Sequence, residues 1–371
     1  MKKNAVSIVL ALALMFGIQN STHAAEKLTY DAALKMAYAN NLTLERTKDS
    51  ADKIDDTLTT GISGMFPEVD PQMASEYMAA SIVNSKSTAY NDLINNQQLT
   101  KQSIDVQKEA IGLGLKNSFI TIENLEKNAT LLDKKIANMR NTLNVNIIKY
   151  KIGMISKMDF DKANLDYEEL LSEKNENILK LKMAYSDLEN LLGTKNEKKI
   201  SYIDLAYTPV SKLNLSLNSQ IGQAVAEAPS IIAQNNQIYL LEQKIKYNLL
   251  DQLQTSLPSK ESKIDVKIKN TELRLSKNDV KTAVISTENR LQNMEAQIEN
   301  LEVQKKNLEQ SVKQLDATVN LGLKTKMELD TVNLSLDEIT QTLENLKETH
   351  QILLERYQKP YLLTLGGQAW N

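Results

Sequence analysis

The feature that most constrains this 371-residue chain is a stretch that occurs twice. Residues 150–170, YKIGMISKMDFDKANLDYEEL, return as residues 319–339, VNLGLKTKMELDTVNLSLDEI, at a distance of 169 positions (319 minus 150). At this distance Gly153 matches Gly322 and Met158 matches Met327. Similarity at a fixed spacing indicates an internal duplication, so the chain is expected to fold as two similar halves.

Apolar residues on both sides of each stretch recur in steps of four and three. In the first half they run from Ile111 to Tyr150 and from Ala163 to Leu191. In the second half they run from 284 to 319 and from 332 to 357, and subtracting 169 from these positions gives the positions of the first half. This spacing is typical of a coiled-coil seam. The sequence therefore predicts two long antiparallel helical hairpins in the same register.

Two polar residues, Lys174 and Asn177, fall on the seam of the first hairpin.

Each predicted turn combines a glycine with a residue that starts helices. Gly153 and Gly322 fit the left-handed conformation in which helices commonly end, because glycine adopts it without a steric penalty. Ser156 and Thr325 follow three residues later and are suitable N-caps for the returning helix. A turn with no further role and a turn that also docks a partner both fit this pattern.

Each half begins with a short amphipathic segment, residues 28–44 and 215–231, which Thr29 or Ser216 can cap. A further helix is expected after each segment, over about 43–62 and 230–254. The long helix that leads into the first turn, from Pro71 to about Tyr150, would be roughly 120 Å long if continuous.

The predicted boundaries follow from these segments. They are a signal peptide at 1–24, a first repeat at 25–193, a polar linker at 194–214, a second repeat at 215–360 and a tail at 361–371.

The N-terminal residues predict export. Lys2 and Lys3 precede an apolar run from Ala5 to Ile18, and THA at 22–24 fits a small-x-small cleavage site. The mature chain is therefore expected in the cell envelope, at the outer membrane or in the periplasm where the cell has them. No later stretch approaches about 18 uninterrupted apolar residues, so no transmembrane helix is expected.

The sequence contains few residues of the kinds that catalysis, metal binding or nucleic-acid binding require. Removing Lys2 and Lys3 changes the formal charge from −3 to −5, and His350 is the one histidine of the mature chain. The absence of cysteine excludes disulfides, thiolate metal sites and cysteine nucleophiles. A mildly acidic chain also lacks the clustered basic excess of nucleic-acid-binding proteins. We expect a protein that is not an enzyme, binds no nucleic acid and uses no cofactor or metal.

An enzymatic or cation-binding alternative would rest on the carboxylates near the first turn. Lys157 and Lys162 lie among them, and helical spacing distributes them around the surface. The carboxylates are Asp159, Asp161, Asp166, Glu168 and Glu169.

In the order of its segments the chain resembles the TolC-like outer-membrane efflux proteins. The resemblance rests on LTYDAALKMAYANN at 28–41, on the turn YKIGMISKMDFDKA at 150–163, on LENLLG at 188–193, and on the duplication and the export signal. It covers nearly the whole mature chain.

The resemblance implies a homotrimer whose helices build a hollow cylinder capped by a β-barrel in the outer membrane. Substrates would pass through the lumen after an inner-membrane pump and a periplasmic adaptor, or membrane fusion protein, dock at the helical tips. The apolar residue after each glycine, Met154 or Leu323, would offer the adaptor a hydrophobic contact. The tip residues implied here are Gly153, Met154, Ile155 and Ser156 in one half and Gly322, Leu323, Lys324 and Thr325 in the other.

The chain departs from the family where each half should insert a β-hairpin, at residues 61–104 and about 255–283. The first stretch lacks sustained apolar and polar alternation and an aromatic girdle, and the second alternates only briefly and is too charged to face lipid. Both favour a proline-marked corner that leads directly into a helix. We therefore predict an all-α chain of coiled-coil hairpins in two tandem repeats, with the β-barrel hairpins reduced or absent. Two functions stay open: an export conduit of TolC type, and a barrel-less helical scaffold or interaction protein of the cell envelope.

Overall fold

The computed structural model describes residues 27–61, 76–213, 215–247 and 258–364. Within these ranges the regular elements are helical, and a single β-bridge joins Leu28 to Ile200. The prediction of an all-α fold is confirmed. The first half contains α2 (Tyr30–Asn40), α3 (Leu42–Asp56), a π-helical turn (Thr57–Gly61), α4 (Glu76–Lys151) and α5 (Lys157–Leu192). The second contains a 3-10 turn (Val210–Lys212), α6 (Leu217–Glu227), α7 (Pro229–Tyr247), α9 (Pro258–Asn320), α10 (Lys326–Gln358) and a 3-10 turn (Pro360–Thr364).

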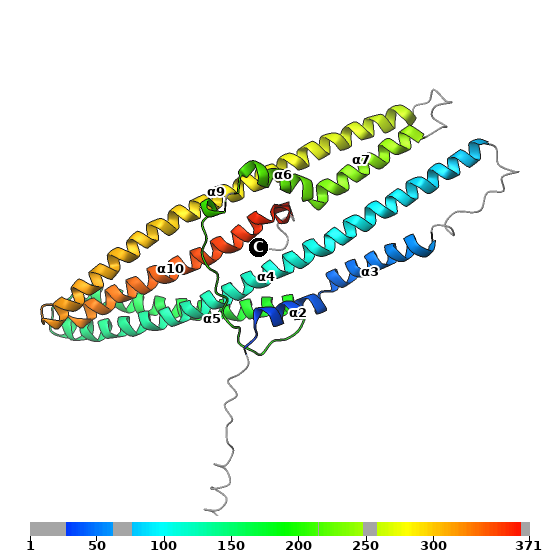
Figure 1. The fold of residues 1–371 in the computed structure, drawn as a ribbon. Helices are drawn as coiled ribbons and strands as arrows, with labels where there is room; N and C mark the ends of the chain where they lie inside the picture. The colour runs from blue at the N-terminus through cyan, green and yellow to red at the C-terminus, as the bar shows by residue number, and fades with distance from the viewer. Residues whose placement is uncertain (1–26, 62–75, 214, 248–257, 365–371) are drawn as a thin grey trace, which may run out of the picture.

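The molecule is elongated, with two long hairpins whose turns lie at the same end (Figure 1). α4 pairs with α5 and α9 with α10, while α3 and α7 lie along the opposite ends of α4 and α9. The 76 residues of α4 span about 110 Å at the helical rise, close to the length expected from the sequence. Because α4 ends 169 residues before α9 and α5 begins 169 residues before α10, the two hairpins keep the register that the sequence predicts.

The predicted seams form the buried stripes of the hairpins. In α5, the seam residues Ala163, Asn177, Ala184 and Leu188 are buried, whereas most residues between them are exposed. Asn177 is satisfied by hydrogen bonds, because its Nδ2 donates to Leu125 O at 3.0 Å and its Oδ1 accepts from Asn128 Nδ2 at 2.9 Å. The seam therefore tolerates polar residues where α4 supplies partners for them.

Lys174, the other polar seam residue, reaches across the hairpin to α4. Its Nζ lies 2.6 Å from Asp133 Oδ1. Because both side chains are partly exposed, this ion pair contributes little to stability and mainly keeps the lysine charge in contact with water.

The short helices predicted at the start of each half pack against one end of its hairpin. Thr29 accepts a hydrogen bond from Ala32 N and starts α2, and Ser216 accepts one from Ser219 N and starts α6. α2 packs on α4 and α5 around a buried core, and α6 and α7 pack on α9 and α10 around a second one. The first core contains Leu28, Ala33, Leu115, Phe119, Ile122, Ala184, Leu188, Leu192 and Ile200. The second contains Ala224, Ala228, Ile231, Ile238, Leu273, Val280, Val284, Leu291, Met294, Leu353, Leu354 and Tyr357.

The end of α5 is fixed against the end of α2. Gly193 takes the left-handed conformation, with φ of 65°, and Asn40 Nδ2 donates to Leu192 O at 2.8 Å. A Cβ at Gly193 would lie 2.6 Å from the Cβ of Asn40. Glycine is therefore required here both for its conformation and for the close approach of α2.

Several sequence predictions fall partly or wholly outside the described residues. These are the signal peptide at 1–24, most of the tail at 361–371, and the stretches 62–75 and 248–257. Within the expected corners, residues 76–104 and 258–283 belong to α4 and α9, so the described parts are helical as predicted. The repeat and linker boundaries stay predictions. In the described parts of the chain, no helix has an apolar stretch long enough to cross a membrane.

Candidate docking surfaces at the hairpin turns

The two hairpin turns have the same backbone geometry. Gly153 and Gly322 have φ of 74° and 72°. In the first turn Gly153 N donates to Tyr150 O at 3.0 Å and Met154 N to Lys149 O at 2.8 Å. In the second, Gly322 N donates to Val319 O at 2.9 Å and Leu323 N to Thr318 O at 3.0 Å. This pair of bonds is the Schellman motif, which satisfies the last carbonyls of the incoming helix.

The returning helices begin with capping boxes at the predicted residues. Ser156 Oγ accepts from Asp159 N at 3.1 Å, and the Asp159 carboxylate accepts from Ser156 N. Thr325 and Glu328 make the same exchange in the second turn. Ser156 and Thr325 therefore fix the start of the returning helix in each turn.

Apolar side chains project from both turns without cover. Met154 is 69% exposed and Leu323 is 72% exposed, although the residue at this position of a Schellman motif frequently packs back on its own helix. Ile152, Met158 and Leu321 are equally exposed. These three are not among the tip residues that the resemblance implies. Their signal in the sequence is that all are apolar and none lies on a seam.

The two turns differ in how their side chains are fixed. In the first, the rings of Tyr150 and Phe160 stack with centroids 5.1 Å apart, and Ile155 is partly buried. In the second, Lys324 Nζ lies 2.8 Å from Glu328 Oε1. This lysine, together with the hydrogen bonds from Thr325, lowers the pKa of Glu328 to about 2. Of the two turns, the first thus presents a more apolar surface and the second a surface with an exposed ion pair.

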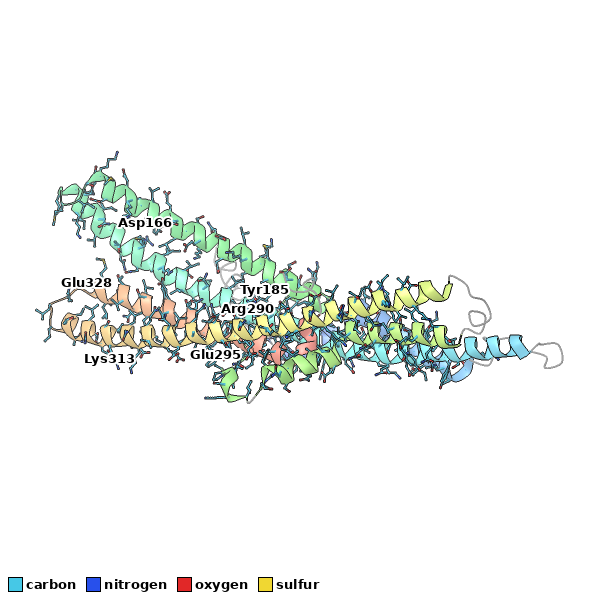
Figure 2. The ribbon with its side chains drawn as sticks, turned by 90° about the horizontal axis from the view of Figure 1, so that it is seen from above. Asp166, Tyr185, Arg290, Glu295, Lys313 and Glu328 are labelled. Carbon is cyan, nitrogen blue, oxygen red and sulfur yellow. The ribbon has the colours of Figure 1, made fainter. Side chains whose placement is uncertain are left out.

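Seen from above, the two hairpins separate toward their turns (Figure 2). α4 contacts α10 as far along as Thr142, whose Oγ1 lies 3.8 Å from Met327 Sδ. Farther along α4, Val145 and Ile148 are exposed, and so is Ile152 in the turn that follows. The turns are therefore two separate surfaces in the single chain.

The outer faces of α5 and α10, on the side away from their seams, have different surroundings. From Gln341 onward, every seventh residue of α10 contacts α4: Gln341 Nε2 donates to Asn124 O, Glu348 contacts Lys127 and Glu355 contacts Lys116. On α5 the equivalent residues include Met158, Leu165 and Leu179, and all three are exposed. We call Met158, Leu165, Leu179 and the neighbouring Met183 the outer face of α5.

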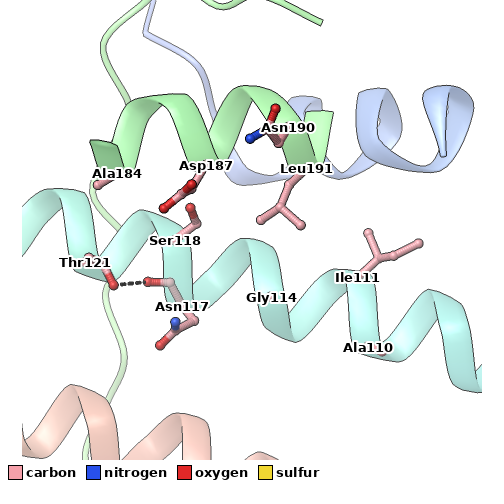
Figure 3. A pocket seen from close by; sticks show the side chains of 10 residues that line it. All are labelled: Ala110, Ile111, Gly114, Asn117, Ser118, Thr121, Ala184, Asp187, Asn190 and Leu191. Atoms are coloured by element: carbon pink, nitrogen blue, oxygen red, sulfur yellow. Dashed lines mark hydrogen bonds between the residues drawn. The ribbon is translucent and has the colours of Figure 1, made fainter. Parts of the chain in front are cut away.

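A groove of about 600 Å³ runs between α4 and the end of α5 (Figure 3). Apart from Ile111, its α4 side is formed by small or polar residues, and Thr121 Oγ1 donates to Asn117 O at 2.8 Å. Its lining residues are Ala110, Ile111, Gly114, Asn117, Ser118, Thr121, Ala184, Asp187, Asn190 and Leu191. Asp187 is the one ionisable side chain of the lining, so the groove contains no set of groups for acid–base or nucleophilic catalysis.

The carboxylates near the first turn do not gather into a site. Asp159 belongs to the capping box, and Asp166 lies on α5 well along from the turn (Figure 2). Across the residues that the structure describes, no group of three or more His, Cys, Asp or Glu side chains could hold a metal ion.

Among the comparisons with known proteins, only the one with solved structures gives matches. No protein-family model matches the sequence, and no curated protein matches it. Solved structures do match: that of CusC, from work on transmembrane channel formation, has a TM-score of 0.63 at 11% identity over 90% of this chain and 91% of that one. The chain has a TolC-like fold.

Two further structures share this fold along nearly their whole length. The CmeC outer membrane channel of Campylobacter jejuni has a TM-score of 0.63 at 9% identity, over 90% of this chain and 86% of that one. The outer membrane protein VceC of Vibrio cholerae has a TM-score of 0.61 at 10% identity, over 88% of this chain and 95% of that one. At these identities the likeness establishes the TolC-like fold, and function has to be argued from the surfaces.

Proposed function

We propose that this chain is a subunit of an export conduit of the cell envelope. Three copies would enclose a path for the substrate, and the hairpin turns would dock a periplasmic adaptor that connects the conduit to an inner-membrane pump. The fold supports this function, since the similar structures include a transmembrane channel and an outer membrane channel.

The observation that carries the proposal is the pair of uncovered turns. Both lie at the same end of the molecule, and both hold an exposed apolar side chain on a rigid, capped backbone. Exposing Met154 and Leu323 to water gains nothing for the fold, whereas a partner that covers them would gain about 1.5–3 kcal/mol for each fully buried side chain. A turn without a further role would more simply carry polar residues.

Assembly from several copies is supported by the outer face of α5. In the second half the equivalent face of α10 is covered by α4 of the same chain. If the two halves are equivalent, α9 of a second copy would cover the outer face of α5 in the same register. An apolar face that no element of its own chain covers is typical of a protein–protein contact.

The residues of α9 fit this role. Lys127 and Lys134 of α4, which bind carboxylates of α10, correspond to Ala296 and Val303 on α9, both exposed. Glu348, one of the carboxylates that contact Lys127, corresponds to Leu179 on α5. The contact of α4 with α10 within the chain is thus ionic, and the equivalent contact of α9 with α5 of another copy would be apolar.

Docking is tested by site-specific photo-crosslinking in the source cells. A photoreactive residue at position 154 or 323 should capture a membrane fusion protein, while one at Leu42, equally exposed but at the start of α3, should not. Replacing Met154 and Leu323 together with serine should reduce export and leave helix content unchanged. Capture of the same protein from position 42, or full export by the double variant, would contradict docking at the turns.

Assembly is tested by fractionating the envelope and measuring the native mass of the extracted protein. We expect a trimer in the outer-membrane fraction, and Leu165→Asp with Leu179→Asp should convert it to monomers. Leu42→Asp, at an exposed leucine of α3 that belongs to neither helix of this contact, is the control and should stay trimeric. Release of the wild-type protein as a peripheral helical species would favour the alternative, a helical scaffold of the envelope.

A further inference from the structure

The linker between the halves forms a strap, residues 200–210, that connects the two hairpins (Figure 1). At its start Ser201 N donates to Leu28 O at 2.9 Å, next to the β-bridge of Ile200. At its end Gln351 Nε2 donates to Thr208 O at 3.1 Å and Val210 N to Glu295 Oε1 at 2.6 Å. The strap is therefore tied to the first half at one end and to the second half at the other.

Between its two ends the strap covers a cavity of about 490 Å³ where α4 packs on α10. The walls of this cavity are unusually rich in charge for a contact between helices. The titratable groups that face Glu348 there are Glu123 and Lys127 from α4, Glu344 and Lys347 from α10, and Tyr202, Asp204 and Tyr207 from the strap.

One lysine forms ion pairs with three carboxylates in this cavity. Lys127 Nζ lies 2.9 Å from Glu123 Oε1, 3.3 Å from Glu344 Oε2 and 3.5 Å from Glu348 Oε1. The other lysine, Lys347, is paired with Glu302 of α9. The side chain of Glu344 is 51% exposed, so water can solvate its charge, but those of Glu123 and Glu348 are only 6% and 12% exposed.

The two buried carboxylates each have one oxygen without a partner. Oε2 of Glu123 and Oε2 of Glu348 are buried and accept no hydrogen bond within the described part of the chain. A buried charged oxygen without a partner is costly, and one lysine neutralises only one of the two charges. Burial, with the nearby charge of Glu123, raises the pKa of Glu348, although Lys127 and Asn124 act in the opposite direction.

We propose that the buried carboxylate pair of Glu123 and Glu348 is a proton-binding site, and that the strap is held more firmly when the proton is bound. With Glu348 neutral, Lys127 and Glu123 form a balanced buried pair and the cavity loses its excess negative charge. This inference concerns contacts within one chain, so it stands whether or not the chain forms a conduit.

The direction of the effect follows from linkage. Because the folded pKa of Glu348 is raised, the folded junction binds more protons than the unfolded chain. Its stabilising contribution is present below the ordinary value of 4.5 and is lost as the pH rises through the raised folded value. The strap should therefore loosen as the pH rises above 4.5 toward neutrality.

Hydrogen exchange of the full-length protein tests this sign. Protection of the Ser201 amide, which donates to Leu28 O, is corrected for intrinsic exchange and measured from the ordinary glutamate pKa of 4.5 upward to neutral pH. We expect protection to fall with rising pH by up to about tenfold per pH unit where Glu348 titrates. Peptides from 207–213 are read separately, because His350 and Glu295 lie at that end of the strap.

Glu348→Gln and Glu344→Gln form a matched pair, because both residues contact Lys127 and only the first is buried. Glu348→Gln should give high protection that no longer depends on pH, and Glu344→Gln should keep the wild-type profile. A wild-type strap that loses protection on acidification would overturn the proposal, as would a Glu348→Gln profile identical to the wild type. The wild-type measurement decides the sign even if a variant does not fold.

Discussion

α5 and α10 occupy the same place in the two halves, yet one is covered on its outer face and the other is not. α10 lies between α9 and α4, and Ile352 is buried; α5 packs on α4 and, at its end, on α2, and the equivalent Met183 is exposed. The seams of the two helices are nevertheless equally regular. The comparison teaches that the seam is specified by the partner within the hairpin, whereas the outer face depends on a neighbour that, among the described residues, only the second half has.

The largest effect should come from a charge on a fully buried seam residue. Leu132→Asp in α4 should cost about 4 kcal/mol or more, because it buries an unpaired carboxylate, whereas Leu301→Asp at the equivalent, partly exposed position of α9 should cost about 1–2 kcal/mol. Urea denaturation followed by circular dichroism measures both. Equal costs would mean that the two seams are buried to the same depth.

Truncation on the outer faces tests the comparison directly. Ile352→Ala in α10 should cost about 2–4 kcal/mol, because it leaves a cavity, and Met183→Ala in α5 should cost below about 0.5 kcal/mol in the isolated chain. The free energy of unfolding is measured at a protein concentration low enough to keep the chain monomeric. A large cost for Met183→Ala under these conditions would show that another element covers α5.

Alanine substitutions at the three glycines with left-handed backbone should distinguish the cost of close packing from the cost of the backbone conformation. Gly153→Ala and Gly322→Ala should each cost about 1 kcal/mol, since nothing lies within 4 Å of the added Cβ. Gly193→Ala should cost about 2–3 kcal/mol, because the new Cβ would also collide with Asn40. Thermal unfolding of the three variants gives the order, and an equal shift in all three would mean that α2 moves away without cost.

The smallest expected effect is a pH dependence of the free energy of unfolding that comes from His350, a residue with no histidine counterpart in the first half. His350 is fully buried, its Nε2 lies 3.1 Å from Glu295 Oε1, and its Nδ1 has no partner among the described residues. Burial lowers its pKa, although Glu295 opposes this, so the folded state binds fewer protons than the unfolded chain. Stability should therefore be complete above the ordinary value of 6.5 and decrease below it, down to the lowered folded pKa.

His350→Leu, which introduces the residue of the equivalent position 181, should remove this acid sensitivity. Denaturation curves recorded on both sides of pH 6.5 provide the measurement. Unchanged acid sensitivity in the variant would assign the effect to another group.

Much of the fold could be predicted from the sequence because the hairpins are built from local, periodic signals. The seams, both glycine turns and the caps at Ser156 and Thr325 follow from spacing and residue type, and the structure places them at these residues. His350 occupies the position that matches the seam residue Leu181, and it is buried as that position predicts.

The surroundings of the seams could not be predicted in the same way. The outer face of α5 reads as scattered apolar residues until the position of α4 beside α10 is known, since the two outer faces differ in their neighbours rather than in their period. The cluster at Lys127 also brings together residues more than 200 positions apart in the chain. Lys324 was predicted as a docking residue, and its ion pair with Glu328 depends on a side-chain conformation that spacing alone does not specify.

The shared register of the four long helices limits how the length of this protein can evolve. Inserting a single residue into α4 would rotate everything beyond it by about 100° and take the seam off its partner. Insertions of seven residues preserve the seam, and each lengthens a helix by about 10 Å. To keep both turns at the same end, an insertion in α4 must be matched in α5, α9 and α10. Lineages of this fold should therefore differ in reach by whole heptads that were gained or lost in all four helices together.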